Sequence, residues 1–178
     1  MELKRVVVTG VGAVTPVGNT AEETWHNMLA GVSGAAPITH FNAEKFKTQF
    51  ACEVKGFDAT QFIDRKEARK MDLYCQFGLA AAQMAVEDSG MDVETLDRKR
   101  AGVVMGVGIG GMRTYEEEVI SYAKTAETIG PKFSPFFVPK MIADICAGHI
   151  SIKYGFHETN YITSSACASS TTALADAF

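Results

Sequence analysis

The stretch that decides the fold is Tyr161-Ile-Thr-Ser-Ser-Ala-Cys-Ala-Ser-Ser-Thr-Thr-Ala-Leu-Ala-Asp-Ala-Phe178. Its first five residues, 161–165, predict a short buried strand, and the small residues from Cys167 onward predict a helix. A strand that passes directly into a helix is typical of α/β proteins, in which helices connect parallel strands. Cys167 stands at the corner between the two predicted elements.

Cys167 is the first candidate for chemistry, because a thiol at the start of a helix lies near the positive end of the helix dipole and near unpaired amide N–H groups. Both favour the thiolate, which is the form that attacks a carbonyl carbon. Four small neighbours leave room for a substrate: Ala166, Ala168, Ser169 and Ser170. Taken alone, the residues leave a second interpretation open, in which Cys167 is a small buried packing residue. Packing is the prediction for the other three cysteines, Cys52, Cys75 and Cys146.

The rest of the chain predicts alternating strands and helices. Strands are expected at 5–9 (RVVVT) and 101–107 (AGVVMGV), with a further short one near 50–54 inside an irregular excursion at 32–63. Helices are expected at 20–29, 64–88, 114–127, 141–154 and from 167 to the last residue. The order β, α, α, β, α, α, β, α predicts an α/β fold in which helical crossovers join the strands of a parallel or mixed sheet.

The composition is that of one ordinary globular domain, with 178 residues, 47% hydrophobic and 21% charged. A net charge of −4 argues against nucleic acid or an acidic membrane as a partner, and the sequence contains no apolar run of about 18 residues. The cysteines form no Cys-x-x-Cys pair, so we expect no metal site. Reduced thiols and the lack of a signal peptide predict a cytoplasmic protein. The last predicted helix has no terminating Gly, Asn or Pro, which indicates a partial chain.

Two further patterns have both a structural and a functional interpretation. Gly106-x-Gly108-x-x-Gly111 matches the dinucleotide-binding pattern, but no strand ending in Asp or Glu follows about 20 residues later. We therefore favour glycines that let the backbone pass close to another element. The basic stripe consists of Arg65, Lys66, Arg69 and Lys70. It is either a solvated face or a docking surface for a small acidic partner. The four histidines are expected at the surface or paired in the core, with His149 the hardest to dismiss.

Several motifs occur in one order along the chain, and together they resemble the bacterial 3-oxoacyl-(acyl-carrier-protein) synthases, most closely those of type II. They are RVVVTGVG (5–12) with TPVG (15–18), RKEARKMD (65–72), GVGIGG (106–111), SPFFVP (134–139), AGHI (147–150) and SACAS (165–169). No single motif is decisive, but the ordered set is highly specific.

The resemblance implies a thiolase-like fold, in which two similar α/β halves, each a mixed sheet with helices on both faces, pack around a central layer of helices. Residues 1–178 would be the N-terminal half, and the C-terminal half would be absent from this chain. The family's two catalytic histidines, a lysine and the second oxyanion-hole amide lie in that second half. These 178 residues alone are therefore expected to be poorly soluble and inactive in condensation.

For this half the resemblance implies one catalytic residue, Cys167, whose thiol is acylated and whose backbone amide is one donor of the oxyanion hole. Ile109 and Phe137 match residues that line the acyl pocket. Phe137 would reach toward the partner subunit of a homodimer. No cofactor or metal is implied.

Lys66, Arg69 and Lys70 match the family's basic patch that meets the acidic acyl carrier protein. The carrier's phosphopantetheine arm would deliver an acyl group to Cys167, and a malonyl group on a second carrier would then be condensed with it after losing carbon dioxide. The resemblance thus implies an acyltransferase of fatty-acid synthesis that lengthens its substrate by two carbons.

The sequence departs from the family at two places near its end. Ser165 stands where Thr is common, and Glu158-Thr159 stand where Gly-Pro is common. Two alternatives remain beside the condensing enzyme. One is a non-catalytic ketosynthase-like partner, or chain-length factor, which usually replaces the cysteine. The other is a nucleotide-binding α/β domain, which depends on the Gly106 cluster.

Overall fold

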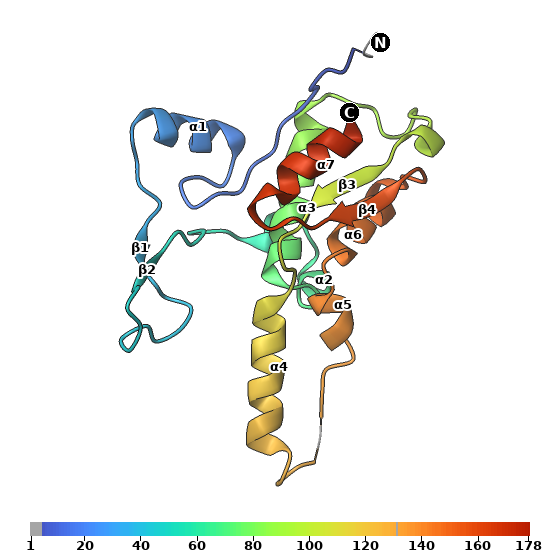
Figure 1. Cartoon of the computed structure of the whole chain (residues 1–178). Helices are drawn as coiled ribbons and strands as arrows, with labels where there is room; N and C mark the ends of the chain where they lie inside the picture. Colours follow the sequence, from blue (N-terminus) through green and yellow to red (C-terminus); the bar gives the residue numbers. More distant parts are fainter. Residues whose placement is uncertain (1–4, 131) are drawn as a thin grey trace.

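The centre of the computed structural model, which describes residues 5–130 and 132–178, is a pair of parallel strands with helices on both faces (Figure 1). Strand β3 (Val103–Gly106) pairs with β4 (Asn160–Thr163) in the register Val103↔Asn160 to Gly106↔Thr163. Helices α3 (Leu73–Asp88) and α6 (Ile145–Tyr154) cover one face, and α7 (Ser169–Ala177) covers the other. The predicted α/β class is confirmed.

The alternation of side chains along the two strands explains these layers. Val103, Met105 and Ile162 point into the apolar core that α3 and α6 share, whose most buried members are Cys75, Leu79, Cys146 and Ala147. Gly106 and Thr163 face the other way, toward the first residue of α7. The second strand pair, β1 (Ala36–Pro37) with β2 (Phe50–Ala51), is antiparallel and lies in the predicted excursion.

Helix α1 (Ala21–Leu29) begins as the sequence predicts. The Thr20 hydroxyl accepts a hydrogen bond from the Glu23 amide at 3.1 Å, and the Glu23 carboxylate accepts one from the Asn19 amide at 2.7 Å. The first bond satisfies an amide that the first turn leaves free, and the second ties the residue before the N-cap Thr20 to the same turn. None of the residues in α1 is buried.

The prediction of a single long helix from Asp64 to Asp88 is wrong, because the structure has two separate helices in this range. Helix α2 (Arg65–Ala68) is one turn long, and α3 starts afresh at Leu73. The cause is Asp72, whose backbone is extended and whose carboxylate accepts a hydrogen bond from the Tyr74 amide at 3.3 Å. An aspartate that can cap a new helix competes with continuation of the old one.

Helix α4 (Met112–Thr125) and the short α5 (Phe137–Met141) form an arm that extends away from the sheet (Figure 1). Stacked rings hold the arm together, with Tyr122 and Phe133 centred 5.1 Å apart. The helix predicted at 141–154 begins later, at Ile145, because Ile142 is extended, and Gly155 ends it in the left-handed region at φ +65°. The remaining helical turns are η1 (Ala59–Gln61), η2 (Arg98–Arg100) and η3 (Ala166–Ala168).

The strand predicted at 5–9 is wrong for this structure, since the segment has no regular secondary structure and Val6, Val7 and Val8 are exposed. The following loop packs on α3 instead, where the Asp88 carboxylate accepts a hydrogen bond from the Val11 amide at 2.8 Å. A β-branched run becomes a strand only when a neighbour accepts its hydrogen bonds, and that depends on tertiary structure. No helix within the described ranges combines the length and apolar character that crossing a bilayer requires.

Candidate active site

Cys167 lies at the predicted strand-to-helix corner and is exposed. Strand β4 ends at Thr163, the turn η3 carries the cysteine, and α7 follows directly. The corner is at the carboxyl ends of the parallel strands, where the loops after β3 and β4 meet and the Ser164 hydroxyl donates to the Gly108 carbonyl at 3.3 Å. In open α/β sheets this edge is where ligands bind.

The backbone at the corner is strained. Ala166 has φ +51° and is the only non-glycine residue with positive φ among the described residues. For a residue with a Cβ atom this conformation costs roughly 1–2 kcal/mol. Strain of this kind persists only where surrounding contacts hold it, and it concentrates at functional sites.

The amide of Cys167 is free to bind a ligand. Within the described part of the chain its N–H donates no hydrogen bond, whereas the amides of Ala168 and Ser169 donate to Ser165 and Ala166. The exposed thiol and this N–H belong to the same residue. The corner can therefore present a nucleophile and a donor for a developing oxyanion to one carbonyl group.

The other cysteines differ from Cys167 in their surroundings. Cys75 and Cys146 are fully buried, as the packing prediction required, and the Cys146 thiol donates to the Cys75 carbonyl at 3.6 Å. An interaction of the Cys75 thiol with the Cys146 side chain, together with burial, raises the pKa of the Cys75 thiol. Cys52 is exposed, so the prediction that it packs in the interior is wrong. It directly follows the two-residue strand β2, of which Phe50 is exposed and Ala51 is half-buried.

Three of the four glycines in the 106–111 loop are packed against other backbone, whereas a Cβ atom on Gly108 would meet nothing within 4 Å. A Cβ atom on Gly106 would lie 2.4 Å from the carbonyl carbon of Ser169, one on Gly110 would lie 2.7 Å from the Met141 carbonyl oxygen, and one on Gly111 would lie 2.2 Å from that of Lys140. Close approach to α5 and α7 accounts for Gly106, Gly110 and Gly111. The nucleotide-binding alternative loses its structural basis, because these positions serve the fold.

Ile109 lies within this loop and lines an apolar cavity of about 340 Å³. The other residues lining it are Gly111, Met112, Tyr115, Met141, Ile142 and Ala143. Such a lining suits an alkyl chain and provides little for a polar ligand.

Phe137 does not line this cavity, but it stacks on a residue that does. Its ring centre lies 6.3 Å from that of Tyr115 and 5.3 Å from that of Phe133. The two predicted acyl-site residues are therefore joined through Tyr115 on α4, which sequence reasoning did not single out.

The three predicted docking residues lie on and just after α2. Lys66 and Arg69 are exposed and form no ion pair with the described residues. Lys70 is less exposed, pairs with Glu67 at 2.6 Å and lies over the ring of Phe136. Two of the three cations are thus available to an acidic partner.

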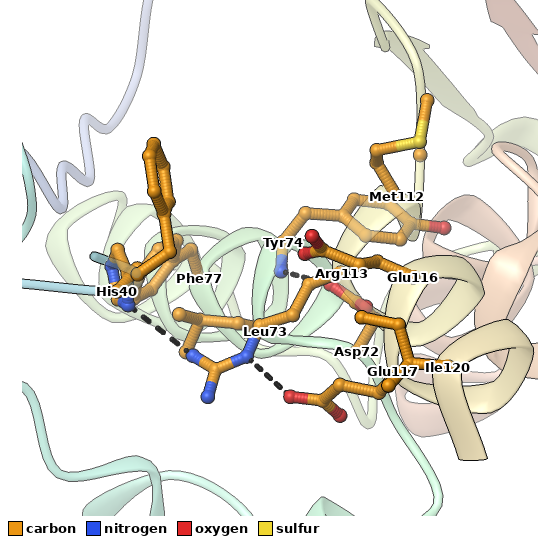
Figure 2. A pocket seen from close by; sticks show the side chains of 12 residues that line it. His40, Asp72, Leu73, Tyr74, Phe77, Met112, Arg113, Glu116, Glu117 and Ile120 are labelled. Carbon is orange, nitrogen blue, oxygen red and sulfur yellow. Dashed lines mark hydrogen bonds and ion pairs between the residues drawn. The ribbon is translucent and has the colours of Figure 1, made fainter. Parts of the chain in front are cut away.

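A second cavity, of about 550 Å³, was not predicted (Figure 2). It opens between the start of α3, the first turns of α4 and the excursion at residue 40. At its mouth the Arg113 guanidinium donates to Glu117 at 2.8 Å and lies 3.4 Å from the His40 ring nitrogen. The sequence contains one hint of this, the i, i+4 spacing of Arg113 and Glu117.

A buried hydrogen-bond pair near this cavity was also missed. The Asp72 carboxylate accepts from the Thr114 hydroxyl at 2.5 Å and from the Thr114 amide at 3.0 Å. Both residues are buried, and their pairing joins the start of α3 to the start of α4. No sequence pattern marks a contact between residues so far apart in the chain.

Comparison with known proteins shows the family. The family model described as "Beta-ketoacyl synthase, N-terminal domain" matches residues 3–178, and the chain belongs to the beta-ketoacyl synthase family. The predicted resemblance is confirmed.

Three curated relatives carry the name 3-oxoacyl-[acyl-carrier-protein] synthase 2. The one from Synechocystis sp. is 43% identical over 100% of this chain and 42% of its own length. The one from Vibrio cholerae is 46% identical over 94% of this chain and 40% of its own length, and the one from Staphylococcus aureus is 41% identical over 98% and 42%. The chain thus spans about two fifths of the length of these relatives.

Solved structures show the same fold. A type II PKS ketosynthase in complex with its acyl-carrier protein and bound to the hexaketide superposes with a TM-score of 0.78, 28% identity and coverage of 98% of this chain and 46% of that one. The ishigamide ketosynthase/chain length factor gives 0.78 at 26% identity, covering 89% of this chain and 39% of that one. The predicted thiolase-like α/β fold is confirmed.

Proposed function

We propose that the protein containing this chain is a condensing acyltransferase of type II fatty-acid synthesis, with Cys167 as its nucleophile. The observation that carries the proposal is the exposed thiol of Cys167 beside its own unpaired amide at the carboxyl edge of β3 and β4. The names of the three curated relatives support it.

In the first stage the Cys167 thiolate attacks the carbonyl carbon of an acyl thioester on acyl carrier protein. The Cys167 amide donates to the oxyanion of the tetrahedral intermediate, which is where an aligned donor stabilises the transition state most. The carbon–sulfur bond to the carrier's phosphopantetheine breaks and its thiolate leaves. The acyl group now forms a thioester with Cys167.

In the second stage a malonyl group on another carrier loses carbon dioxide, and the electron pair of the broken bond remains on the α-carbon. That carbanion attacks the Cys167 thioester, a carbon–carbon bond forms, and the Cys167 thiolate leaves. The product is a 3-oxoacyl carrier two carbons longer than the starting acyl group. Covalent capture divides one difficult step into two easier ones.

The alkyl chain of the substrate is proposed to lie against Ile109 in the 340 Å³ cavity, with Phe137 at its border through Tyr115. The second half of the protein is proposed to supply the two histidines, the lysine and the other oxyanion donor, so the 178 residues alone should not condense. We further propose a cytoplasmic homodimer that uses no cofactor of its own, since the carriers bring the phosphopantetheine. Residues 1–178 would be its N-terminal half.

The first test is acylation of the whole protein by an acyl carrier thioester, followed by intact mass and peptide mapping. We expect one acyl group on Cys167 and none in Cys167→Ala. The matched control is Cys52→Ser, which replaces the other exposed cysteine and should be acylated as the unmodified protein is. An acyl group on another residue, or none, would exclude the proposal.

The second test concerns the carrier, which is proposed to dock on Lys66, Arg69 and Lys70. Reversing the two unpaired charges in Lys66→Glu/Arg69→Glu should raise KM for the carrier substrate about 10-fold or more at low salt, because like charges would then face each other. Added salt should shrink the difference. The control Lys99→Glu alters an exposed lysine on η2 and should leave KM unchanged. Equal KM values in all three proteins would place the docking surface elsewhere.

The alternative of a chain-length factor is disfavoured because such partners usually replace the cysteine that this chain retains. The ishigamide ketosynthase/chain length factor superposes as well as the ketosynthase does, so the fold does not separate the two functions. Acylation of Cys167 does separate them.

A further inference from the structure

Ser169, the first residue of α7, is one of three buried polar or charged residues in the described part of the chain, at 3% exposed. Its hydroxyl donates to the Ala166 carbonyl at 2.7 Å and accepts from the Ser165 amide at 2.9 Å. An N-cap serine accepts from amides further along its own helix, but Ser169 comes one residue after the N-cap Ala168. Here both hydrogen bonds go back to the two residues that precede Cys167.

The bond to Ala166 acts on Cys167 because of the geometry of the peptide group. The carbonyl of Ala166 and the N–H of Cys167 belong to one rigid plane, and in the trans form they point in opposite directions. The Ser169 hydroxyl shares the Ala166 oxygen with the Ser169 backbone N–H, and together they set the direction of the Cys167 N–H. The hydroxyl polarises the same amide group and so makes its N–H a better donor.

Ser169 is itself held by both strands. Its carbonyl accepts from the Thr163 hydroxyl at 2.8 Å, at the end of β4. Its backbone lies so close to Gly106, at the end of β3, that a Cβ atom there would be 2.4 Å from its carbonyl carbon. Ser169 thus connects the strained turn at Ala166 to both strands of the sheet.

We propose that Ser169 is a positioning residue, whose hydroxyl aims the Cys167 amide and thiol at one acyl carbonyl. The inference rests on the proposed function, since it assigns a role within acylation. Ser169 is buried and acts through the Ala166–Cys167 peptide, while its second hydrogen bond holds the Ser165 amide.

The test compares two reactions of Cys167 in the whole protein. Transfer from an acyl carrier thioester needs the oxyanion donor, whereas alkylation by iodoacetamide needs the thiol but forms no oxyanion. In Ser169→Ala we expect single-turnover acylation to slow at least about 10-fold with KM unchanged, because a misdirected donor loses part of its effect. Alkylation should change less than about threefold. A merely structural role would slow both reactions together, and that result would overturn the inference.

Two further variants sharpen the test. Ser170→Ala removes the neighbouring hydroxyl, which is exposed, and should acylate at the normal rate. Ala166→Gly removes the conformational strain, so that the pair Ala166→Gly and Ala166→Gly/Ser169→Ala can be compared even where Ser169→Ala alone does not fold. We expect the same selective loss of acylation in that background.

The two proposals fail differently. If the unmodified protein takes no acyl group on Cys167, the proposed function is wrong. If it is acylated normally and Ser169→Ala is acylated equally fast, only the role of Ser169 is wrong.

Discussion

Cys146 and Cys167 both lie at the start of a helix, yet their surroundings have little in common. Cys146 is the second residue of α6 and is completely buried between α6 and α3. Cys167 lies two residues before α7 and is exposed. The two thiols differ in whether solvent can reach them, so position at the start of a helix does not by itself identify a nucleophile.

The buried site is closed by one glycine. A Cβ atom on Gly78 of α3 would lie 2.5 Å from the Cys146 sulfur and 3.3 Å from the Met105 methyl carbon. At the exposed site, contacts with the sheet and with Ser169 hold the turn in place, and the Cys167 thiol stays exposed. Close packing at Cys146 leaves no room for another molecule to reach the thiol, whereas the thiol of Cys167 can be reached from solvent.

The largest expected effect concerns the reactivity of the thiols. In the folded whole protein, iodoacetamide should modify Cys146 and Cys75 at least about 1,000-fold more slowly than Cys167, because both wait for an opening of the core. Peptide mapping over time measures the rates. In denaturant the rates should converge, which is the control. Fast labelling of Cys146 in the folded protein would contradict the comparison.

A smaller effect is expected from filling the space beside Cys146. Gly78→Ala should lower the free energy of unfolding by about 1–3 kcal/mol, since the new methyl group overlaps the sulfur. The matched control is Gly148→Ala on α6, where a Cβ atom meets nothing within 4 Å and helix propensity gains up to about 1 kcal/mol. Denaturant unfolding measures both. Adding Cys146→Ala to Gly78→Ala should recover part of the loss; strict additivity would show that the sulfur is not the obstacle.

The smallest expected effect is a pH dependence at His149, a half-buried residue of α6. Burial lowers its pKa from 6.5, and Glu67 opposes the shift. The folded state therefore binds a proton at His149 less readily than the unfolded state does. The free energy of unfolding is unaffected by this group above pH 6.5 and decreases as the pH falls below that value. Asp64, Glu67 and Lys153 line the same cavity.

Thermal unfolding between pH 7.5 and 5.5 checks this sign. The melting temperature should fall more in the unmodified protein than in His149→Gln, which cannot take up the proton. The exposed His157→Gln is the control and should follow the unmodified protein. A steeper fall in His149→Gln would show that protonation of His149 stabilises the folded state.

Local signals predicted most of the helices and the corner at Cys167. Thr20 with Glu23 marked the start of α1, and Gly155 marked the end of α6. The same reasoning failed where one local sequence is compatible with two different structures. The RVVVT run at 5–9 suits a strand but forms none, and Asp72 starts a new helix inside a run that would otherwise continue.

The amino-acid sequence by itself determined the two strands of the central sheet, the family and the thiol at position 167, because each depends on residues that are neighbours along the chain. Only the tertiary structure decided which cysteines are reachable, that Asp72 meets Thr114, and that Ser169 holds the Ala166 carbonyl beneath the strained turn. The reason is physical. Burial and the direction of a peptide group depend on packing between segments distant in sequence, and local pattern carries no record of that packing.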